Sequence, residues 1–279
     1  MRADGIRVKN EDPMYYLIPH FLRNRYDSMN MVTIDIPVEP LRLYMNEKRK
    51  EGRPVSHMAL ILAAYLRTIE EFPAINRFIV NKKIYAHKDV TVSMVVLRPG
   101  SNDDTMSKIS FDFTDDIFTV NGKIGEYISE NRTAEDNPLD RIMKVLIKMN
   151  WLLSIGINIL RFMDKHGLLP MSLIKVSPFH ASLLISNLAS IRTNHIYHHV
   201  YDFGTTSIAI TMGNMREVPR RTKNGIVHDR CLPLGIVMDE RICSGHYFAM
   251  AFSRLKEYLN DPTLLEKPGK AETAALNAN

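Results

Sequence analysis

The sequence is poor in cysteine, and it has neither a long uninterrupted apolar run nor a dense block of like charge. Its two cysteines, Cys231 and Cys243, match no zinc-ligand or CxxC spacing. The most apolar segment, residues 138–165, is interrupted by lysine, arginine and asparagine and falls short of the about 20 apolar residues that a membrane span needs. The polar start, MRADGIRVKNEDP, cannot form the apolar core of a secretion signal. These absences argue against a disulfide-stabilised secreted fold and favour a reducing, cytoplasmic location.

Charged residues of both signs are interspersed along the chain. The 36 lysines and arginines and the 31 aspartates and glutamates leave a formal net charge of +5. The densest basic cluster, residues 48–53, contains Glu51, and Arg220, Arg221 and Lys223 fall in a predicted hairpin turn. A nucleic-acid groove needs a basic stripe interleaved with aromatic side chains. The sequence therefore predicts no nucleic-acid partner, whereas its basic balance suits an anionic small ligand.

Hydrophobic periodicity predicts strands and helices that are interleaved without a simple βα repeat, which is typical of an α/β or α+β domain. Strands are predicted at residues 31–36, 90–97, 111–118, 182–186, 206–212 and 232–238, and a hairpin at residues 78–85. Helices are predicted at residues 41–51, 57–71 and 244–259, with Ser56 as the cap of the second helix. Hydrophobic residues make up 45% of the chain, enough to bury one sizeable core.

The apolar segment at residues 138–165 has three possible roles. Its mixture of apolar residues with a few lysines predicts one or two core helices. A contact between subunits and a helix lying in a membrane interface are the alternatives.

Four short motifs carry a resemblance to a known family. Residues 233–259 read PLGIVMDERICSGHYFAMAFSRLKEYL, a strand of the form PLxIxx that leads into a variant of HxxxDG and then into a helix. Residues 72–76 (FPAIN), 185–188 (ISNL) and 211–213 (TMG) fit a P-x-x-N after the first long helix and the ends of two core strands. The chain resembles the CoA-dependent acyltransferases, which include chloramphenicol acetyltransferases and the catalytic domain of dihydrolipoyl acyltransferases of 2-oxoacid dehydrogenase complexes.

This resemblance implies a fold and an assembly. The expected fold is a two-layer α/β (α+β) domain in which helices flank a mixed β-sheet. The resemblance covers residues 16–265, so residues 1–15 are expected to form an N-terminal arm and residues 266–279 a flexible tail. Relatives form homotrimers, some of which assemble into larger cages, and their active-site channel runs between neighbouring subunits. Coenzyme A or acyl-CoA is the expected substrate, and no metal is expected.

The family's catalytic groups carry over onto this chain with two changes. The serine that stabilises the oxyanion falls on Ser186, and the general-base histidine falls on Glu240. The downstream aspartate falls on Ser244. The residues expected to support the site structurally, besides Ser244, are Asp202, Asp239, Arg241 and Gly245.

Three interpretations of the missing histidine stay open. Glu240 itself is one candidate base, since a buried carboxylate can act as a base near neutrality. The adjacent His198 and His199 are a second candidate, with Asp202 supplying the carboxylate that would fix an imidazole tautomer. The third interpretation is a catalytically inactive homologue that serves as a trimeric scaffold or ligand binder.

The short N-terminal arm also restricts the acyl acceptor. About fifteen residues precede the resemblance, too few for a lipoyl domain. An active protein of this length is therefore expected to acylate a free small molecule or the lipoyl group of a partner protein.

Overall fold

The computed structural model describes residues 2–9, 11–97, 104–133 and 150–270, and its centre is a large mixed β-sheet. Strands follow one another across this sheet in the order β2-β10-β8-β7-β5-β6. Strand β7 is parallel to both of its neighbours, β5 and β8, and the other pairs are antiparallel. The strands are β2 (Met29–Pro37), β5 (Val90–Leu97), β6 (Asp104–Phe111), β7 (Leu183–Asn187), β8 (Ile208–Met212) and β10 (Gly225–Asp239).

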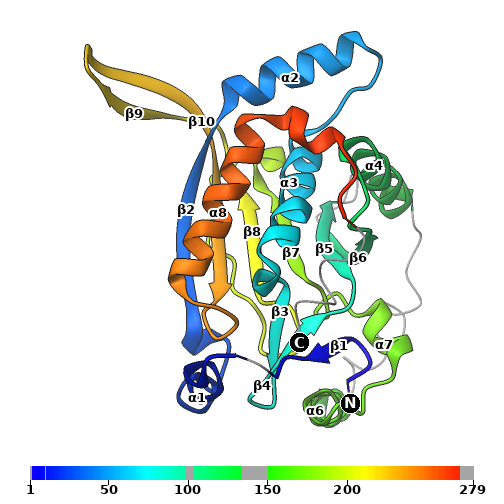
Figure 1. Ribbon diagram of the computed structural model, residues 1–279. Helices are drawn as coiled ribbons and strands as arrows, with labels where there is room; N and C mark the ends of the chain where they lie inside the picture. Colours follow the sequence, from blue (N-terminus) through cyan, green and yellow to red (C-terminus); the bar gives the residue numbers. More distant parts are fainter. Residues whose placement is uncertain (1, 10, 98–103, 134–149, 271–279) are drawn as a thin grey trace.

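A helical layer covers one face of this sheet (Figure 1). It comprises α2 (Val38–Lys50), α3 (His57–Glu71), α4 (Ile117–Thr133) and α8 (Gly245–Asn260). Alternation along β10 sends Leu234, Ile236 and Met238 into the core beneath these helices, whereas Val237 packs in a separate cluster on the opposite face. Helix α3 begins where Ser56 Oγ accepts a hydrogen bond from the amide of Ala59 at 3.1 Å, as the sequence predicts.

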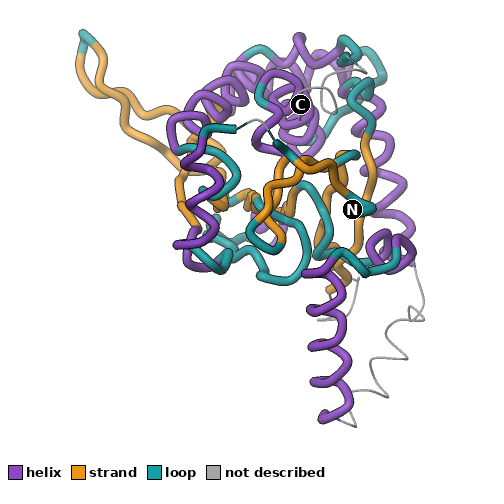
Figure 2. The backbone as a smooth tube through the Cα atoms, turned by 60° about the horizontal axis from the view of Figure 1, so that its bottom comes forward, coloured by secondary structure: helices purple, strands orange, loops and turns teal. Residues whose placement is uncertain are grey.

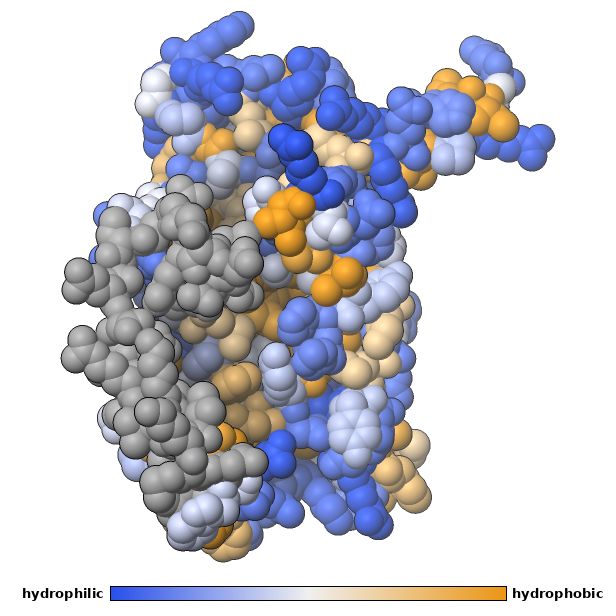
Figure 3. All heavy atoms as spheres, turned by 180° about the vertical axis from the view of Figure 1, so that it is seen from behind, coloured by the Kyte–Doolittle hydropathy of each residue, from blue (hydrophilic) through white to orange (hydrophobic). Residues whose placement is uncertain are grey.

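Within the described residues, irregular chain crosses the opposite face of the sheet. Residues 192–204 cross this face, and Val200 packs there against Leu184, Ala209 and Val237. Figure 3 shows this side of the molecule, where apolar and polar side chains alternate on an uneven surface. One face buried by helices and one crossed by a loop make this a two-layer α/β domain, the expected architecture.

A smaller three-stranded sheet lies at one end of the domain. Its order is β1-β4-β3, with β1 (Gly5–Arg7), β3 (Arg77–Val80) and β4 (Lys83–His87). Asn81 and Lys82 join β3 to β4 with φ angles of 49° and 60°. Two left-handed residues in a two-residue turn fit the right-handed twist of a hairpin. This confirms the hairpin predicted at residues 78–85.

Two elements project from the body of the domain (Figure 2). Strand β9 (Arg216–Thr222) pairs with the first half of β10 and forms an arm, which confirms the predicted hairpin at Arg220, Arg221 and Lys223. The other projecting element is helix α6 (Asn150–His166). Two shorter helices, α1 (Pro13–Phe21) and α7 (Met171–Val176), lie near the smaller sheet (Figure 1).

Two predictions from the sequence were wrong. No strand spans residues 111–118, because β6 ends at Phe111 and α4 begins at Ile117. The described part of the apolar segment, α6, is a helix but not a core helix in this chain. Its side chains Trp151, Ile155, Ile159 and Phe162 are 64%, 49%, 53% and 59% exposed; residues 138–149 of the segment lie outside the described residues. Among the helices described, none is long and apolar enough to cross a bilayer.

The buried His87 makes folding stability depend on pH. Burial lowers the pKa of His87 to about 4, while its Nε2 lies 3.3 Å from the carbonyl oxygen of Thr205. In the unfolded chain, the His87 imidazole is therefore protonated below about pH 6.5, whereas in the folded chain it is protonated only below about pH 4. We expect this histidine to lower the free energy of unfolding by about 3 kcal/mol as the pH falls from 6.5 to 4. Urea denaturation at several pH values measures it.

The variant His87→Gln should lose this part of the pH dependence, whatever its absolute stability. The matched control is His228→Gln, which removes an exposed histidine from the β9–β10 arm. Equal slopes between pH 6.5 and 4 in the parent and His87→Gln would contradict the assignment.

Candidate functional site

The turn that follows β10 is organised around a buried carboxylate. Asp239 is fully buried, and its carboxylate lies 2.7 Å from Arg241 Nη2 and 3.5 Å from Arg25 Nε. Ser28 Oγ also donates to it at 3.0 Å. Complete burial lowers the pKa of Arg25, and the negative charge of Asp239 partly offsets that effect. The pair of guanidinium groups holds the end of β10 against the start of β2.

Glu240, the residue predicted to replace the histidine, begins this turn. Its amide donates to the carbonyl oxygen of Ser28 at 2.9 Å, which continues the β2–β10 ladder by one residue. Its Oε2 accepts a hydrogen bond from Asn30 Nδ2. Its Oε1 makes no hydrogen bond or ion pair within the described part of the chain, and the side chain is half-buried. One carboxylate oxygen is thus held in place and the other is available.

Ser244 and Gly245 have a structural role in the same turn. Ser244 Oγ accepts a hydrogen bond from the amide of Tyr247 at 3.2 Å and caps α8, which begins at Gly245. With Asp239 and Arg241, they are brought together with Glu240 in a stretch of seven residues.

Ser186, the predicted oxyanion donor, lies near the end of β7 on the face crossed by the loop. The strand registers place it in one row with residues of three neighbouring strands. Ser186 is level with Thr211 of β8, Thr211 with Gly235 of β10, and Gly235 with Thr33 of β2. This row forms the floor on which the 192–204 loop rests.

His195 lies above this row, a position that sequence reasoning missed. Its Nε2 lies 3.0 Å from Thr33 Oγ1. Thr33 Oγ1 also lies 2.7 Å from Tyr197 Oη. Burial, and then the positive charge of Arg216, lower the pKa of His195, which favours its neutral form. Its Nδ1 is buried and makes no hydrogen bond among the described residues.

Glycine allows this close approach of the loop to the sheet. A Cβ on Gly235 would lie 2.5 Å from the carbonyl oxygen of Ile196 and 3.0 Å from His195 Cδ2. A Cβ on Gly213 would lie 2.2 Å from the amide nitrogen of His195. The position of His195 therefore depends on two glycines, one within β10 and one directly after β8, a signal present in the sequence.

We expect Gly235→Ala to displace residues 195–196 and to lower the free energy of unfolding by about 1–3 kcal/mol, as overpacking does. Chemical denaturation measures the change. The control is Gly122→Ala in α4, where a Cβ would meet nothing within 4 Å and where alanine should stabilise the helix by about 0.5–1 kcal/mol. Equal stability of Gly235→Ala and the parent would show that the loop is not held as described.

The second candidate base, the His198–His199 pair, is not supported by Asp202. The two imidazole rings stack with centroids 4.8 Å apart, and His198 Nδ1 lies 2.8 Å from the carbonyl oxygen of His199. Asp202 Oδ1 instead accepts a hydrogen bond from the backbone amide of Arg25 at 2.5 Å. The expected imidazole–carboxylate pair is therefore not formed, because Asp202 is committed to the loop before β2.

Ser186 and Glu240 lie far apart in one chain. Glu240 is five residues beyond Gly235 along β10, and Ser186 is two strands away from Gly235. With a rise of about 3.3 Å per residue and strands about 4.8 Å apart, their Cα atoms are separated by roughly 15–20 Å. An oxyanion donor and a base that serve one tetrahedral intermediate must lie within a few ångströms of it. These two side chains cannot act on the same carbonyl within a single chain.

Comparisons with solved structures give the fold its name. The cubic core of the pyruvate dehydrogenase multienzyme complex superposes with a TM-score of 0.61 at 15% identity, covering 92% of this chain and 93% of that one. Chloramphenicol acetyltransferase superposes with a TM-score of 0.55 at 12% identity, covering 91% and 99%. The chain has the chloramphenicol acetyltransferase-like fold. The fold expected from the sequence is therefore confirmed.

The description of a third structure with this fold names particular residues of that enzyme. The dihydrolipoamide acetyltransferase of Azotobacter vinelandii has a TM-score of 0.60 at 15% identity, covering 92% of this chain and 93% of that one. Its study concerned a serine, a histidine and an asparagine in catalysis, the last two four residues apart. No family model and no curated protein matches the sequence. Among the described residues, no group of three or more histidine, cysteine, aspartate or glutamate side chains could hold a metal ion.

Proposed function

We propose that the protein transfers an acyl group from acyl-CoA to a small-molecule acceptor or to the lipoyl group of a partner protein, with Glu240 as general base. The observation that carries the proposal is the held but accessible carboxylate of Glu240. Asn30 fixes one of its oxygens, and the Asp239–Arg241 turn fixes its backbone. Glu240 and Ser244 have the same separation as the histidine and asparagine named for the Azotobacter vinelandii enzyme.

The proposed reaction is a two-step acyl transfer. Glu240 accepts the proton of the acceptor thiol or hydroxyl as the sulfur or oxygen attacks the thioester carbonyl carbon. The Ser186 hydroxyl donates a hydrogen bond to the oxyanion of the tetrahedral intermediate. The intermediate then expels the CoA sulfur, which takes the proton from Glu240 and leaves as the free thiol.

A second copy of the chain completes the proposed site. Since Ser186 and Glu240 are roughly 15–20 Å apart in one chain, we assign them to the same reaction only across a subunit interface. The Ser186 row and the Glu240 turn lie on different parts of the sheet, so a rotationally symmetric trimer can bring one chain's serine to its neighbour's carboxylate. The exposed apolar side chains of Ile196 and Tyr197 in the loop, and of Ile191 just before it, suit such an interface.

Release of the CoA thiol tests this function. The purified protein is incubated with acetyl-CoA and a panel of alcohol, amine and dihydrolipoamide acceptors, and free thiol is measured. Acceptor-dependent thiol release is the expected result.

A catalytically inactive scaffold is the alternative, favoured by the carboxylate in place of the imidazole. Absence of thiol release with every acceptor, together with saturable CoA binding in calorimetry, would overturn the proposal in favour of a ligand-binding homologue. If light scattering at micromolar protein concentration showed a monomer, that result would contradict the proposal of a site shared between subunits.

A further inference from the structure

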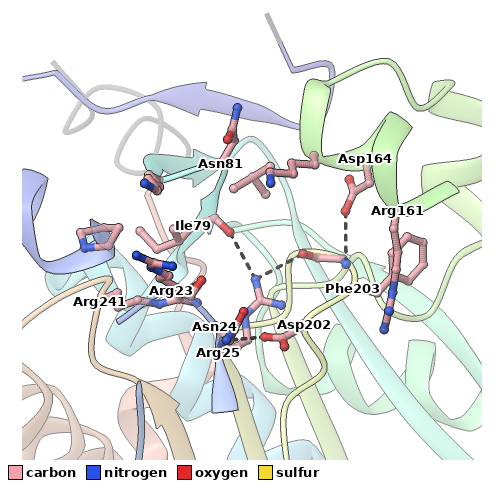
Figure 4. Close-up of a pocket in the computed structure, with 15 residues that line it drawn as sticks. Arg23, Asn24, Arg25, Ile79, Asn81, Arg161, Asp164, Asp202, Phe203 and Arg241 are labelled. Carbon is pink, nitrogen blue, oxygen red and sulfur yellow. Dashed lines mark hydrogen bonds between the residues drawn. The ribbon is translucent and has the colours of Figure 1, made fainter. Parts of the chain in front are cut away.

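A cavity of about 660 Å³ lies apart from Glu240 and Ser186. It is bounded by the chain after α1, the turn between β3 and β4, the last turns of α6 and the loop at residues 202–204. Figure 4 shows Arg23 and Arg241 on one side of this cavity and Arg161 on the other. Its volume falls in the range of small-molecule sites.

Four cationic side chains line this cavity without an acidic partner. They are Arg23, Lys82, Arg161 and Lys165. Within the described chain, none of the four has a carboxylate at ion-pair distance, and the nearest polar contact is that of Lys82 Nζ, 3.4 Å from His20 Nδ1. Cations gathered around one cavity repel each other, and an anion bound between them would relieve that repulsion.

The two carboxylates of the cavity are engaged elsewhere. Asp164 forms a salt bridge with Arg2 at 2.8 Å, and its carboxylate lies 3.2 Å from His180 Nε2. It also accepts a hydrogen bond from the amide of Gly204 at 3.3 Å. Asp202 is held by the amide of Arg25. These contacts anchor the end of α6 to the body of the domain and fix the cavity wall. They also leave the four cations uncompensated.

The floor of the cavity holds two buried arginines whose charge is balanced by carboxylates. The guanidinium groups of Arg25 and Arg241 both line it, and they share the carboxylate of Asp239. The negative charge of Asp202 also acts on Arg25, whose Nε has no hydrogen-bond partner within the described residues. The unbalanced positive charge of the cavity therefore lies on the four cations above.

We propose that this cavity binds a phosphorylated small molecule that carries at least two negative charges. Guanidinium groups bind phosphate oxygens through paired hydrogen bonds, and ammonium groups add compact positive charge. The chemistry fits a diphosphate, either free, as part of a nucleotide, or within a CoA molecule. The proposal goes beyond the proposed function, because neither Glu240 nor Ser186 lines this cavity; the cavity shares with the proposed site only the supporting residues Asp202 and Arg241.

Titration calorimetry with inorganic pyrophosphate, ADP and CoA tests this site. The variant Arg161→Gln/Lys165→Gln removes two cations from α6 at the cavity wall. The control Arg221→Gln/Lys223→Gln removes two exposed cations from the β9–β10 arm. We expect saturable pyrophosphate binding by the parent, weakened at least 10-fold in the cavity variant and unchanged in the control. Equal weakening in both variants, or no saturable binding of any probe, would overturn the proposal.

The source of the phosphate groups follows from the same variants. If the KM for acyl-CoA rises in the cavity variant along with the Kd for ADP, the cavity holds the nucleotide end of the thioester donor. If pyrophosphate and ADP binding weaken while the kinetics of acyl-CoA stay unchanged, a separate phosphorylated ligand occupies it. Both results support the site, and neither depends on whether Glu240 acts as a base.

Discussion

Replacing Glu240 by glutamine is expected to lower kcat for acyl transfer by about 10²- to 10⁴-fold, the usual contribution of a general base. Glutamine keeps the size of the side chain and the carbonyl oxygen that can accept a hydrogen bond from Asn30, but it cannot take a proton. KM for acyl-CoA should change little, because the carboxylate acts in the transition state. Steady-state thiol release measures both parameters. An unchanged kcat would remove Glu240 from the chemistry and direct attention to His198 and His199.

The shared site predicts rescue between two inactive variants. Ser186→Ala and Glu240→Gln chains are each expected to be poorly active alone. When the two are refolded together, random mixing should restore about a quarter of the sites, because one interface in four combines the intact serine with the neighbour's intact glutamate. A mixture no more active than its components would contradict a site formed between subunits. Co-refolding of each variant with itself is the control.

Replacing Asp239 by asparagine is expected to lower the free energy of unfolding by about 3–5 kcal/mol. Asparagine fills the same space but leaves the guanidinium groups of Arg25 and Arg241 buried without a counter-charge. The effect follows from desolvation, since both arginines are buried in the folded chain. Urea denaturation measures the loss, and the slope of the free energy of unfolding against urea concentration should stay the same as in the parent.

The control for this prediction is Asp229→Asn on the β9–β10 arm. Asp229 also forms an ion pair, with Arg220, but both side chains are exposed to solvent or nearly so. Water and salt screen exposed pairs, so this variant should unfold like the parent. A similar loss in both variants would mean that burial does not decide the energy of the Asp239 network.

Local sequence patterns predict most of the strands and helices of the fold. Alternation of apolar residues predicts β10 as a strand, and Ser56 predicts the start of α3. The described elements bear out both. The wrong strand at residues 111–118 illustrates the limit of such patterns, because a short apolar run suits either a strand end or a helix start. The exposure of α6 could not be predicted, since a helix of that apolar content is usually buried by its neighbours.

Only part of the candidate site can be predicted from the sequence. The motif around Glu240 can be found because its residues are adjacent. The partners that give it shape, Arg25 and Ser28, come from the other end of the chain and meet Asp239 only through the pairing of β2 with β10. Asp202 is the opposite case. It is close to His199 in sequence, which suggests a carboxylate–imidazole pair, but in the structure Asp202 accepts a hydrogen bond from the Arg25 amide instead. The phosphate cavity draws on five separate segments and has no local signature.

Strand β10 joins the most exposed part of the domain to its most buried turn. It runs unbroken from Gly225 in the projecting arm to Asp239, a length of about 50 Å at 3.3 Å per residue. The first half is solvated, and the second half is clamped between β2 and β8. The backbone of one strand therefore connects the solvated arm directly to Asp239, the residue that precedes Glu240.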